Sequence, residues 1–398
     1  MIIWFVLLVP LIAIIILISF WGKKLAWWEI LILAGVSIGL IAIMKVTGTA
    51  SVTRDTEYWG DLVERAEYYE EYEIWDHETC YHQVPCGTDS KGNTEYCTES
   101  YDCSHADYHS PYWRVITTSG WNLYISQNLW QRLIKKFGAV PIFKDMNRES
   151  ELGFGDYIMK DGDMYYIEWP KTPKTSYMVA TTHHYENRVQ CSRSLFNPRP
   201  VSPEEVKKNA LFDYPYVNND YDVPTILGTL IPNQSEAEEK FKFLNGDLGP
   251  KKQVRVWVLL FRNQPLSTGL SQEAYWKRGN MNEFVVTIGL DYLNNVKWCH
   301  AFSWMANTTI AVETRDFVTQ QKKLDLVQLA DFLYKEINAK WVRRDFKKEF
   351  SYITVEPPTW SIIVALIINV LFNIGFGWWS VKNDFTFANP KGEYNSRY

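Results

Sequence analysis

The sequence of 398 residues lacks the short motifs that mark the common classes of enzyme. It has no GxSxG nucleophile elbow, no GxxxxGK[ST] phosphate loop, no GxGxxG dinucleotide fingerprint and no HExxH zinc motif. It also has no long block of Lys and Arg, and its formal net charge is −5, so no basic face is available for a nucleic-acid partner. These absences favour a protein that is not an enzyme and does not bind nucleic acid.

Long apolar runs, in contrast, occur at three places: Ile2–Phe20, Ala26–Met44 and Trp360–Trp379. A helix of about 20 residues, with a rise of about 1.5 Å per residue, crosses the hydrocarbon core of a bilayer. We therefore predict three transmembrane helices, of which the first two form a hairpin over residues 1–46 and the third covers residues 359–380. The lipid bilayer is thus an expected partner.

Two asparagines, Asn369 and Asn373, lie one turn apart in the third run. Amide side chains prefer a helix partner to lipid, so these residues predict packing against the hairpin or against another protomer.

The orientation is predicted from charges and cysteines. Lys23 and Lys24 between the first two runs favour the cytoplasm. The region between the second and third helices is then extracytoplasmic, and the tail at 381–398 is cytoplasmic. A basic cluster just before the third run opposes this orientation: Arg343, Arg344, Lys347 and Lys348. The six cysteines, an even number, all lie in the intervening region and favour an oxidising compartment.

The intervening region reads as an α+β soluble domain with a β-rich first half and an α/β-like second half. Its predicted parts are a juxtamembrane linker (47–60), a β-rich subdomain that contains the cysteines (61–196), a Pro-rich crossover (197–252) and an α/β-like subdomain (253–358).

Turn and cap residues predict several elements in the first half. Trp113–Tyr124 is expected to form a hairpin that turns at Ser119-Gly120, and a helix should begin after Ser126 and end at Gly138. A second hairpin is expected over Tyr157–Trp169, with Asp161-Gly162-Asp163 at its tip, and residues 76–111 are expected to form a cysteine-rich loop.

The second half carries three strand-like runs and one helical pattern. The strands are predicted at Val254–Phe261, Glu283–Leu290 and Val296–Trp304, and the helix at Leu324–Trp341.

Cysteine and histidine residues are densest between residues 77 and 109. Two disulfides among Cys80, Cys86, Cys97 and Cys103 are the main interpretation. The sequence does not rank their three possible pairings, and the nested pairing Cys80–Cys103 with Cys86–Cys97 is our first hypothesis. The alternative is a structural zinc site, although no CxxC knuckle is present. Its candidate ligands are Cys80, His82, Cys86, Cys97, Cys103 and His105.

A polar and aromatic stretch between two predicted buried strands is the candidate binding surface. Its candidate residues are Gln272, Tyr275, Trp276, Asn280 and Glu283. The alternative is an ordinary capped loop or helix without a binding role.

Several runs resemble uncharacterised membrane proteins encoded by tailed bacteriophages and their bacterial hosts. The similar runs are QVRVWVLLFRNQP, QEAYWKRGNMNEFVVTIG, VKWCHAFSW, FSYITVEPP and THHYENRVQCSRSLF. The resemblance implies a bacterial inner membrane and a phage-linked role. It transfers no catalytic residues, because that group has no assigned activity.

Together these patterns predict a multi-pass membrane protein with an extracytoplasmic domain that binds a protein partner or a second copy of itself, as a binding or structural component of the envelope. No cofactor is expected. The alternative is a membrane-tethered hydrolase or zinc-dependent enzyme that uses the cluster of cysteines and histidines.

Overall fold

The computed structural model describes residues 2–21, 25–88, 90–172, 175–192, 199–217 and 223–383. Lys23, Lys24 and nearly all of the predicted cytoplasmic tail lie outside these residues. The chain divides into two compact units. The first comprises residues 1–56, 184–198 and 345–398, and the second comprises residues 57–183 and 199–344.

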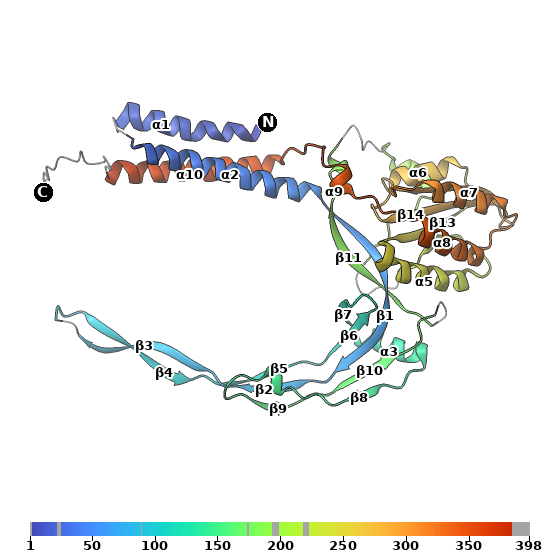
Figure 1. Ribbon diagram of the computed structural model, residues 1–398, viewed down its shortest axis with the longest axis horizontal. Helices are drawn as coiled ribbons and strands as arrows, with labels where there is room; N and C mark the ends of the chain where they lie inside the picture. The colour runs from blue at the N-terminus through green and yellow to red at the C-terminus, as the bar shows by residue number, and fades with distance from the viewer. Residues whose placement is uncertain are drawn as a thin grey trace. The chain divides into compact units, whose positions relative to one another are not determined.

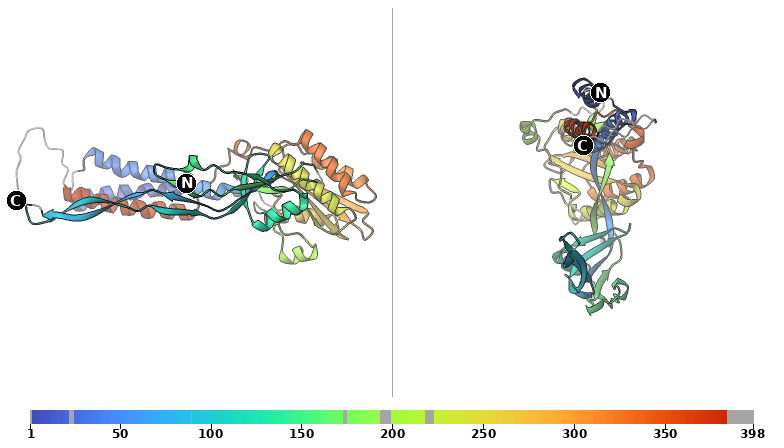
Figure 2. Two further views of the ribbon diagram at one scale, coloured as in Figure 1. Left: turned by 90° about the horizontal axis from the view of Figure 1, so that it is seen from below. Right: turned by 90° about the vertical axis from the view of Figure 1, so that its left-hand side faces the viewer.

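Three apolar segments lie side by side in the first unit (Figures 1 and 2). They are formed by the 3₁₀ helix η1 (Ile2–Leu7) with α1 (Leu8–Trp21), by α2 (Trp27–Thr53) and by α10 (Thr359–Asn383). The short elements η3 (Val189–Cys191) and α9 (Phe346–Glu349) belong to the same unit.

Among the residues that the structure describes, two helices, rather than the predicted three, are long and apolar enough to cross a membrane. They cover Trp27–Thr53 near the N-terminus and Thr359–Lys382 near the C-terminus. The first apolar run differs because its first six residues adopt the tighter 3₁₀ conformation, which leaves an α-helix of 14 residues. The segment at 47–60 is also not a linker. Backbone hydrogen bonding continues α2 to Thr53, and strand β1 starts at Arg54.

Polar side chains join these apolar helices. Asn369 on α10 donates from Nδ2 to the Val6 carbonyl oxygen (2.9 Å), and its Oδ1 accepts from the Ser37 hydroxyl of α2 (2.8 Å). Asn373 donates to the Asn369 carbonyl oxygen (2.7 Å). Asn369 therefore packs against the other apolar segments, as the sequence predicted, since an amide in apolar surroundings needs a hydrogen-bonding partner.

The second unit begins with a six-stranded sheet in the order β7-β6-β1-β10-β8, with β11 paired to β1. The strands are β1 (Arg54–Tyr69), β6 (Tyr112–Thr117), β7 (Asn122–Ile125), β8 (Ile142–Lys144), β10 (Met164–Glu168) and β11 (Met178–Glu186). Helix α3 (Gln127–Phe137) adds Leu129, Trp130 and Leu133 to the core of this sheet. The β6–β7 hairpin is confirmed. So are the Ser126 cap, whose hydroxyl accepts from the Leu129 N–H, and the left-handed Gly138.

The second predicted hairpin is wrong, although both of its strands exist. Strand β9 (Tyr157–Lys160) pairs with β2 (Tyr72–Asp76) in a three-stranded sheet that is completed by β5 (His105–His109), whereas β10 pairs with β1 and β8. The chain changes sheets at Gly162, which has φ +57° and where a Cβ would lie 2.5 Å from the Glu71 carbonyl oxygen. Position 162 therefore tolerates only glycine, and the turn crosses the neighbouring backbone instead of closing a hairpin. The 3₁₀ helix η2 (Glu149–Glu151) precedes β9 in the sequence.

The α/β-like part is a four-stranded sheet in the order β12-β13-β14-β15. Strands β12 (Ile226–Gly228), β13 (Arg255–Arg262) and β14 (Glu283–Leu290) are parallel, and β15 (Val296–Ser303) is antiparallel. Three strands thus occur where the sequence predicted them. Three of the helices, α5 (Gln234–Lys252), α7 (Thr309–Gln320) and α8 (Leu326–Lys340), share one core with Val256, Val258 and Leu260 of β13.

The opposite face of this sheet packs on other elements. Trp257, Leu259 and Phe261 of β13 share a second core with Trp276, which follows α6 (Ser267–Tyr275), and with the segment around Leu211. Helix α4 (Pro203–Lys208) precedes that segment. Burial of both faces explains why β13 is an unbroken apolar run. Helix α5 occupies the last third of the region that was predicted as a Pro-rich crossover (197–252), so that third is a regular helix.

Candidate functional site

The most exposed element of the second unit is a long hairpin formed by β3 (Thr79–Thr88) and β4 (Thr94–Asp102). These residues, 79–102, are called the arm below. Every residue of β4 is exposed, and β3 has only two half-buried residues. The arm forms a two-stranded sheet of its own that continues from the sheet of β2, β5 and β9 (Figures 1 and 2). The region predicted as a cysteine-rich loop is therefore an extended ribbon.

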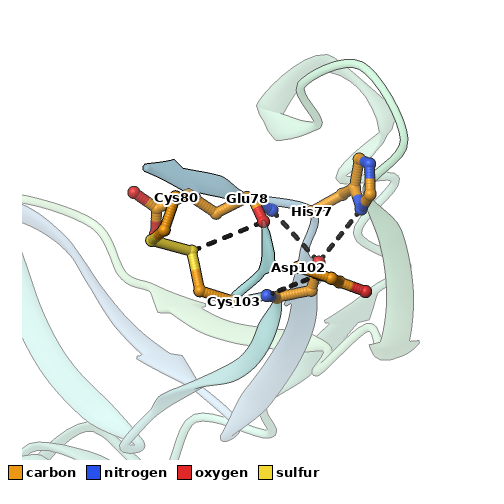
Figure 3. The surroundings of a disulfide bond; sticks show 6 residues. His77, Glu78, Cys80, Asp102 and Cys103 are labelled. Atoms are coloured by element: carbon orange, nitrogen blue, oxygen red, sulfur yellow. Dashed lines mark hydrogen bonds between the residues drawn. A yellow bond between two sulfur atoms is a disulfide. The ribbon is translucent and has the colours of Figure 1, made fainter. Parts of the chain in front are cut away.

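Two disulfides cross-link the arm. They join Cys80 to Cys103 and Cys86 to Cys97, which confirms the nested hypothesis. Figure 3 shows the Cys80–Cys103 disulfide at the base of the arm. There the Cys103 N–H donates to the Glu78 carbonyl oxygen (3.0 Å). The Ser104 N–H donates to Asp102 Oδ1 (2.9 Å), and the hydrogen bonds from Ser104 hold the pKa of the Asp102 carboxyl below its usual value.

The disulfides leave none of these four sulfurs as a thiolate, which is the form that binds zinc. The two histidines of the alternative zinc site lie beside other residues. His82 Nε2 is 4.0 Å from Glu99, and His105 pairs with Asp76 in the neighbouring sheet. The structure therefore supports disulfides at this cluster.

The register divides the arm into two chemically different faces, because directly opposed residues and alternate residues of a strand point to the same side. Val84 lies opposite Cys97, His82 opposite Glu99, and Cys80 opposite Tyr101. This side, called the disulfide face, therefore also carries Glu95, two residues before Cys97. The other side is uncharged along most of its length and is called the tyrosine face. It carries Tyr81, Gln83, Pro85, Tyr96, Thr98 and Ser100.

The five residues predicted as a binding surface are brought together, but around a segment of their own chain. Gln272 accepts from the Phe212 N–H (2.9 Å) and donates to the Phe212 carbonyl oxygen (3.1 Å). Trp276 Nε1 donates to the same oxygen (2.7 Å), and the Tyr275 hydroxyl donates to Asp213 (2.6 Å).

The remaining two residues hold Tyr214. The Tyr214 hydroxyl donates to Glu283 and accepts from Asn280 Nδ2 (3.1 Å). Gln272, Trp276 and Glu283 are buried, so these groups are not open to a partner on the surface. A binding role for this cluster stays a prediction.

A residue that the sequence did not single out, Arg255, lies in the same cluster. Its side chain is fully buried, and among the described residues none of its guanidinium nitrogens has a hydrogen-bond partner. The guanidinium lies 4.3 Å from the centre of the Trp257 ring. Burial lowers the pKa of Arg255, and burial with the nearby Glu283 raises the pKa of Tyr214 well above its ordinary value. Arg255 was not singled out in the sequence because it lies at the start of an apolar run.

A second polar cluster links α4 to α6 and gives a pH-dependent prediction. The guanidinium of Arg199 donates to Glu205 (2.7 Å from Nη1 to Oε2), and the Ser271 hydroxyl donates to Glu205 Oε1 (2.7 Å). These bonds lower the pKa of Glu205 to about 2.

The carboxylate form of Glu205 is thus favoured by folding. Its contribution is present above an unfolded-state pKa of about 4.3 and is lost as the pH falls toward 2. We expect Glu205→Gln to flatten the pH dependence of the denaturation midpoint between about pH 5 and pH 2. Glu204→Gln, next in sequence, should leave most of that slope. Equal slopes in wild type and Glu205→Gln would contradict the prediction.

No family model matches the chain, and neither a curated protein nor a solved structure is similar to it.

Proposed function

We propose that the chain is a membrane-anchored protein whose extracytoplasmic region binds another protein through the arm. The observation that carries the proposal is the exposed hairpin with its two disulfides. An isolated two-stranded hairpin is marginally stable in water, and cross-links of this kind are typical of oxidising compartments. A cross-linked ribbon with little buried surface has no role in the core, which favours a role in contacts with a partner.

The membrane anchor is supported by the two long apolar helices. The helices over Trp27–Thr53 and Thr359–Lys382 precede and follow the region with the disulfides. If both cross the bilayer, that region is tethered at both of its ends on one face of the membrane, with η1 and α1 packed beside them. The resemblance to phage-encoded membrane proteins adds a bacterial inner membrane to the proposal.

Thiol labelling of intact cells tests the proposal, because the two free cysteines differ in access. Cys191 is exposed, whereas Cys299 is buried, and burial raises the pKa of the Cys299 thiol to about 12. A membrane-impermeant maleimide should label wild type in intact cells and should not label Cys191→Ser.

The redox state is read in the same experiment after denaturation. Without reductant, two cysteines should react, and after reduction all six should react. Fractionation of the cells should place the chain in the membrane fraction. Labelling of Cys191 only after cell lysis, or recovery of the chain without detergent, would refute the proposal.

A further inference from the structure

An exposed apolar patch with basic residues lies at the carboxyl end of the parallel strands. Leu230 follows β12, and Tyr292 and Leu293 follow β14, with exposed fractions of 80%, 72% and 71%. Arg262, the last residue of β13, holds the two loops together. Its Nη1 donates to the Tyr292 carbonyl oxygen (3.2 Å), and its Nη2 donates to the Leu230 carbonyl oxygen (3.3 Å).

Three exposed lysines lie beside these apolar residues. Lys322 accepts from the Val296 N–H through its carbonyl oxygen, and Lys323 forms a backbone bridge with Asn295, so both lie next to the loop that carries Tyr292. Lys297 pairs with Asp291 (3.1 Å). Among the described residues, neither Lys322 nor Lys323 has a carboxylate partner. Leu230, Tyr292, Leu293, Lys297, Lys322 and Lys323 are called the sheet-end patch.

The disulfide face of the arm has the complementary pattern. Glu95 and Glu99 lie on this face, four residues apart and thus separated by about 13 Å along the strand. Between them lie Val84 and the Cys86–Cys97 disulfide, which are apolar. The arm thus offers an apolar centre with carboxylates on both sides, and the sheet-end patch offers apolar side chains with ammonium groups beside them.

We infer that the sheet-end patch binds the arm of a second copy of this chain. Exposed apolar groups flanked by charge mark interaction surfaces, and complementary charge selects the partner and its orientation. Because the arm and the patch are different surfaces, the contact is heterologous, and each copy uses its arm on one neighbour and its patch on another. Such contacts build a ring or an open chain.

This inference rests on the proposed function, which supplies the conditions for a weak contact. Copies that are anchored in one membrane face meet at a high effective concentration, so a contact of modest area suffices for assembly. The arm itself requires the oxidising side of the membrane, since its cross-links form there.

The test uses the full-length chain in bacterial membranes, with two co-expressed copies that carry different tags. After mild solubilisation without reductant, one tag is captured and the other is quantified. When both copies carry reversed arm charges (Glu95→Lys with Glu99→Lys), capture should fall about tenfold. Reversed patch charges in both copies (Lys322→Glu with Lys323→Glu) should do the same. The matched control, Lys207→Glu with Lys208→Glu on α4, should capture as wild type does.

The decisive sample contains one copy with the reversed arm and one with the reversed patch. Each variant alone carries like charges on both surfaces, whereas the mixture offers opposite charges at both contacts. Capture should therefore return to the wild-type level.

Absence of self-capture in wild type, insensitivity to both reversals, or failure of the mixture to recover would each overturn the inference. Capture of a different protein by the wild-type arm in place of a second copy would also overturn it. If Cys191 is labelled from outside and only the capture results fail, the proposed function stands and this inference falls. If the chain is not in the membrane, the proposed function fails, and the capture results still decide self-association.

Discussion

Gly249→Ala should lower the free energy of unfolding of the second unit by about 3 kcal/mol or more. A Cβ at position 249 of α5 would lie 2.0 Å from the Gly60 carbonyl oxygen of β1 and 3.1 Å from the Gly60 nitrogen. Both atoms belong to the backbone, so no side-chain rotation relieves the contact. Helix α5 and strand β1 would have to separate, and the buried Leu62 and Leu248 nearby would lose part of their packing.

Chemical denaturation of the chain in detergent, followed by tryptophan fluorescence, measures this change as a lower midpoint. Gly87→Ala is the matched control, because the nearest atom to its Cβ, Glu95 Oε2, is 3.8 Å away. That control should shift stability by no more than about 0.5 kcal/mol. The reciprocal variant Gly60→Ala should also destabilise, since its Cβ would lie 2.8 Å from the Asn245 carbonyl oxygen. Equal stability of Gly249→Ala and wild type would contradict the close approach of α5 and β1.

The sequence predicted elements best where local chemistry decides them. Strand β14 begins and ends at the predicted residues, and the Ser126 cap and the left-handed Gly138 define α3. In each case a cap, a turn or an uninterrupted apolar run acts over a few residues. These signals do not depend on the rest of the chain.

Pairing partners were harder to predict because they are decided by distant residues. β9 and β10 follow each other in sequence with a turn between them, yet they join different sheets through contacts with β2 and β1. Helix α5 was missed for another reason. Its core residues Ala237, Phe241, Leu244 and Leu248 have helical spacing, but they follow a segment rich in proline.

The candidate sites were predictable only in part. The cysteine spacing led to the correct disulfides, but exposure of the arm depends on what the rest of the unit leaves uncovered. The sheet-end patch gave no signal in sequence, because Leu230 is separated by more than 60 residues from Tyr292 and meets it only through Arg262. Such a surface is created by the parallel order of the strands.

Removal of the two disulfides should unfold the arm and leave the rest of the second unit folded. The cross-links span sequence separations of 23 and 11 residues, and loops of this size predict a stabilisation of about 3 kcal/mol for each disulfide. In a domain with a hydrophobic core, burial of apolar side chains keeps the chain folded when this stabilisation is lost. None of the described residues of the arm is buried, and all of β4 is exposed. A lone hairpin is marginal without cross-links. The effect should therefore be local and complete.

Hydrogen exchange measures this directly in a variant with Cys80, Cys86, Cys97 and Cys103 all changed to serine. Backbone amides of residues 79–102 should lose their protection, while amides of the buried strands β13 and β14 should keep theirs. Cys191→Ser, which removes an exposed free thiol, should exchange as wild type does. If the arm stays protected without its disulfides, other contacts must hold it. If β13 and β14 also lose protection, the arm is part of the cooperative core of the unit. If only the arm loses protection and self-capture is also lost, the cross-links maintain a binding element, because the rest of the fold is intact.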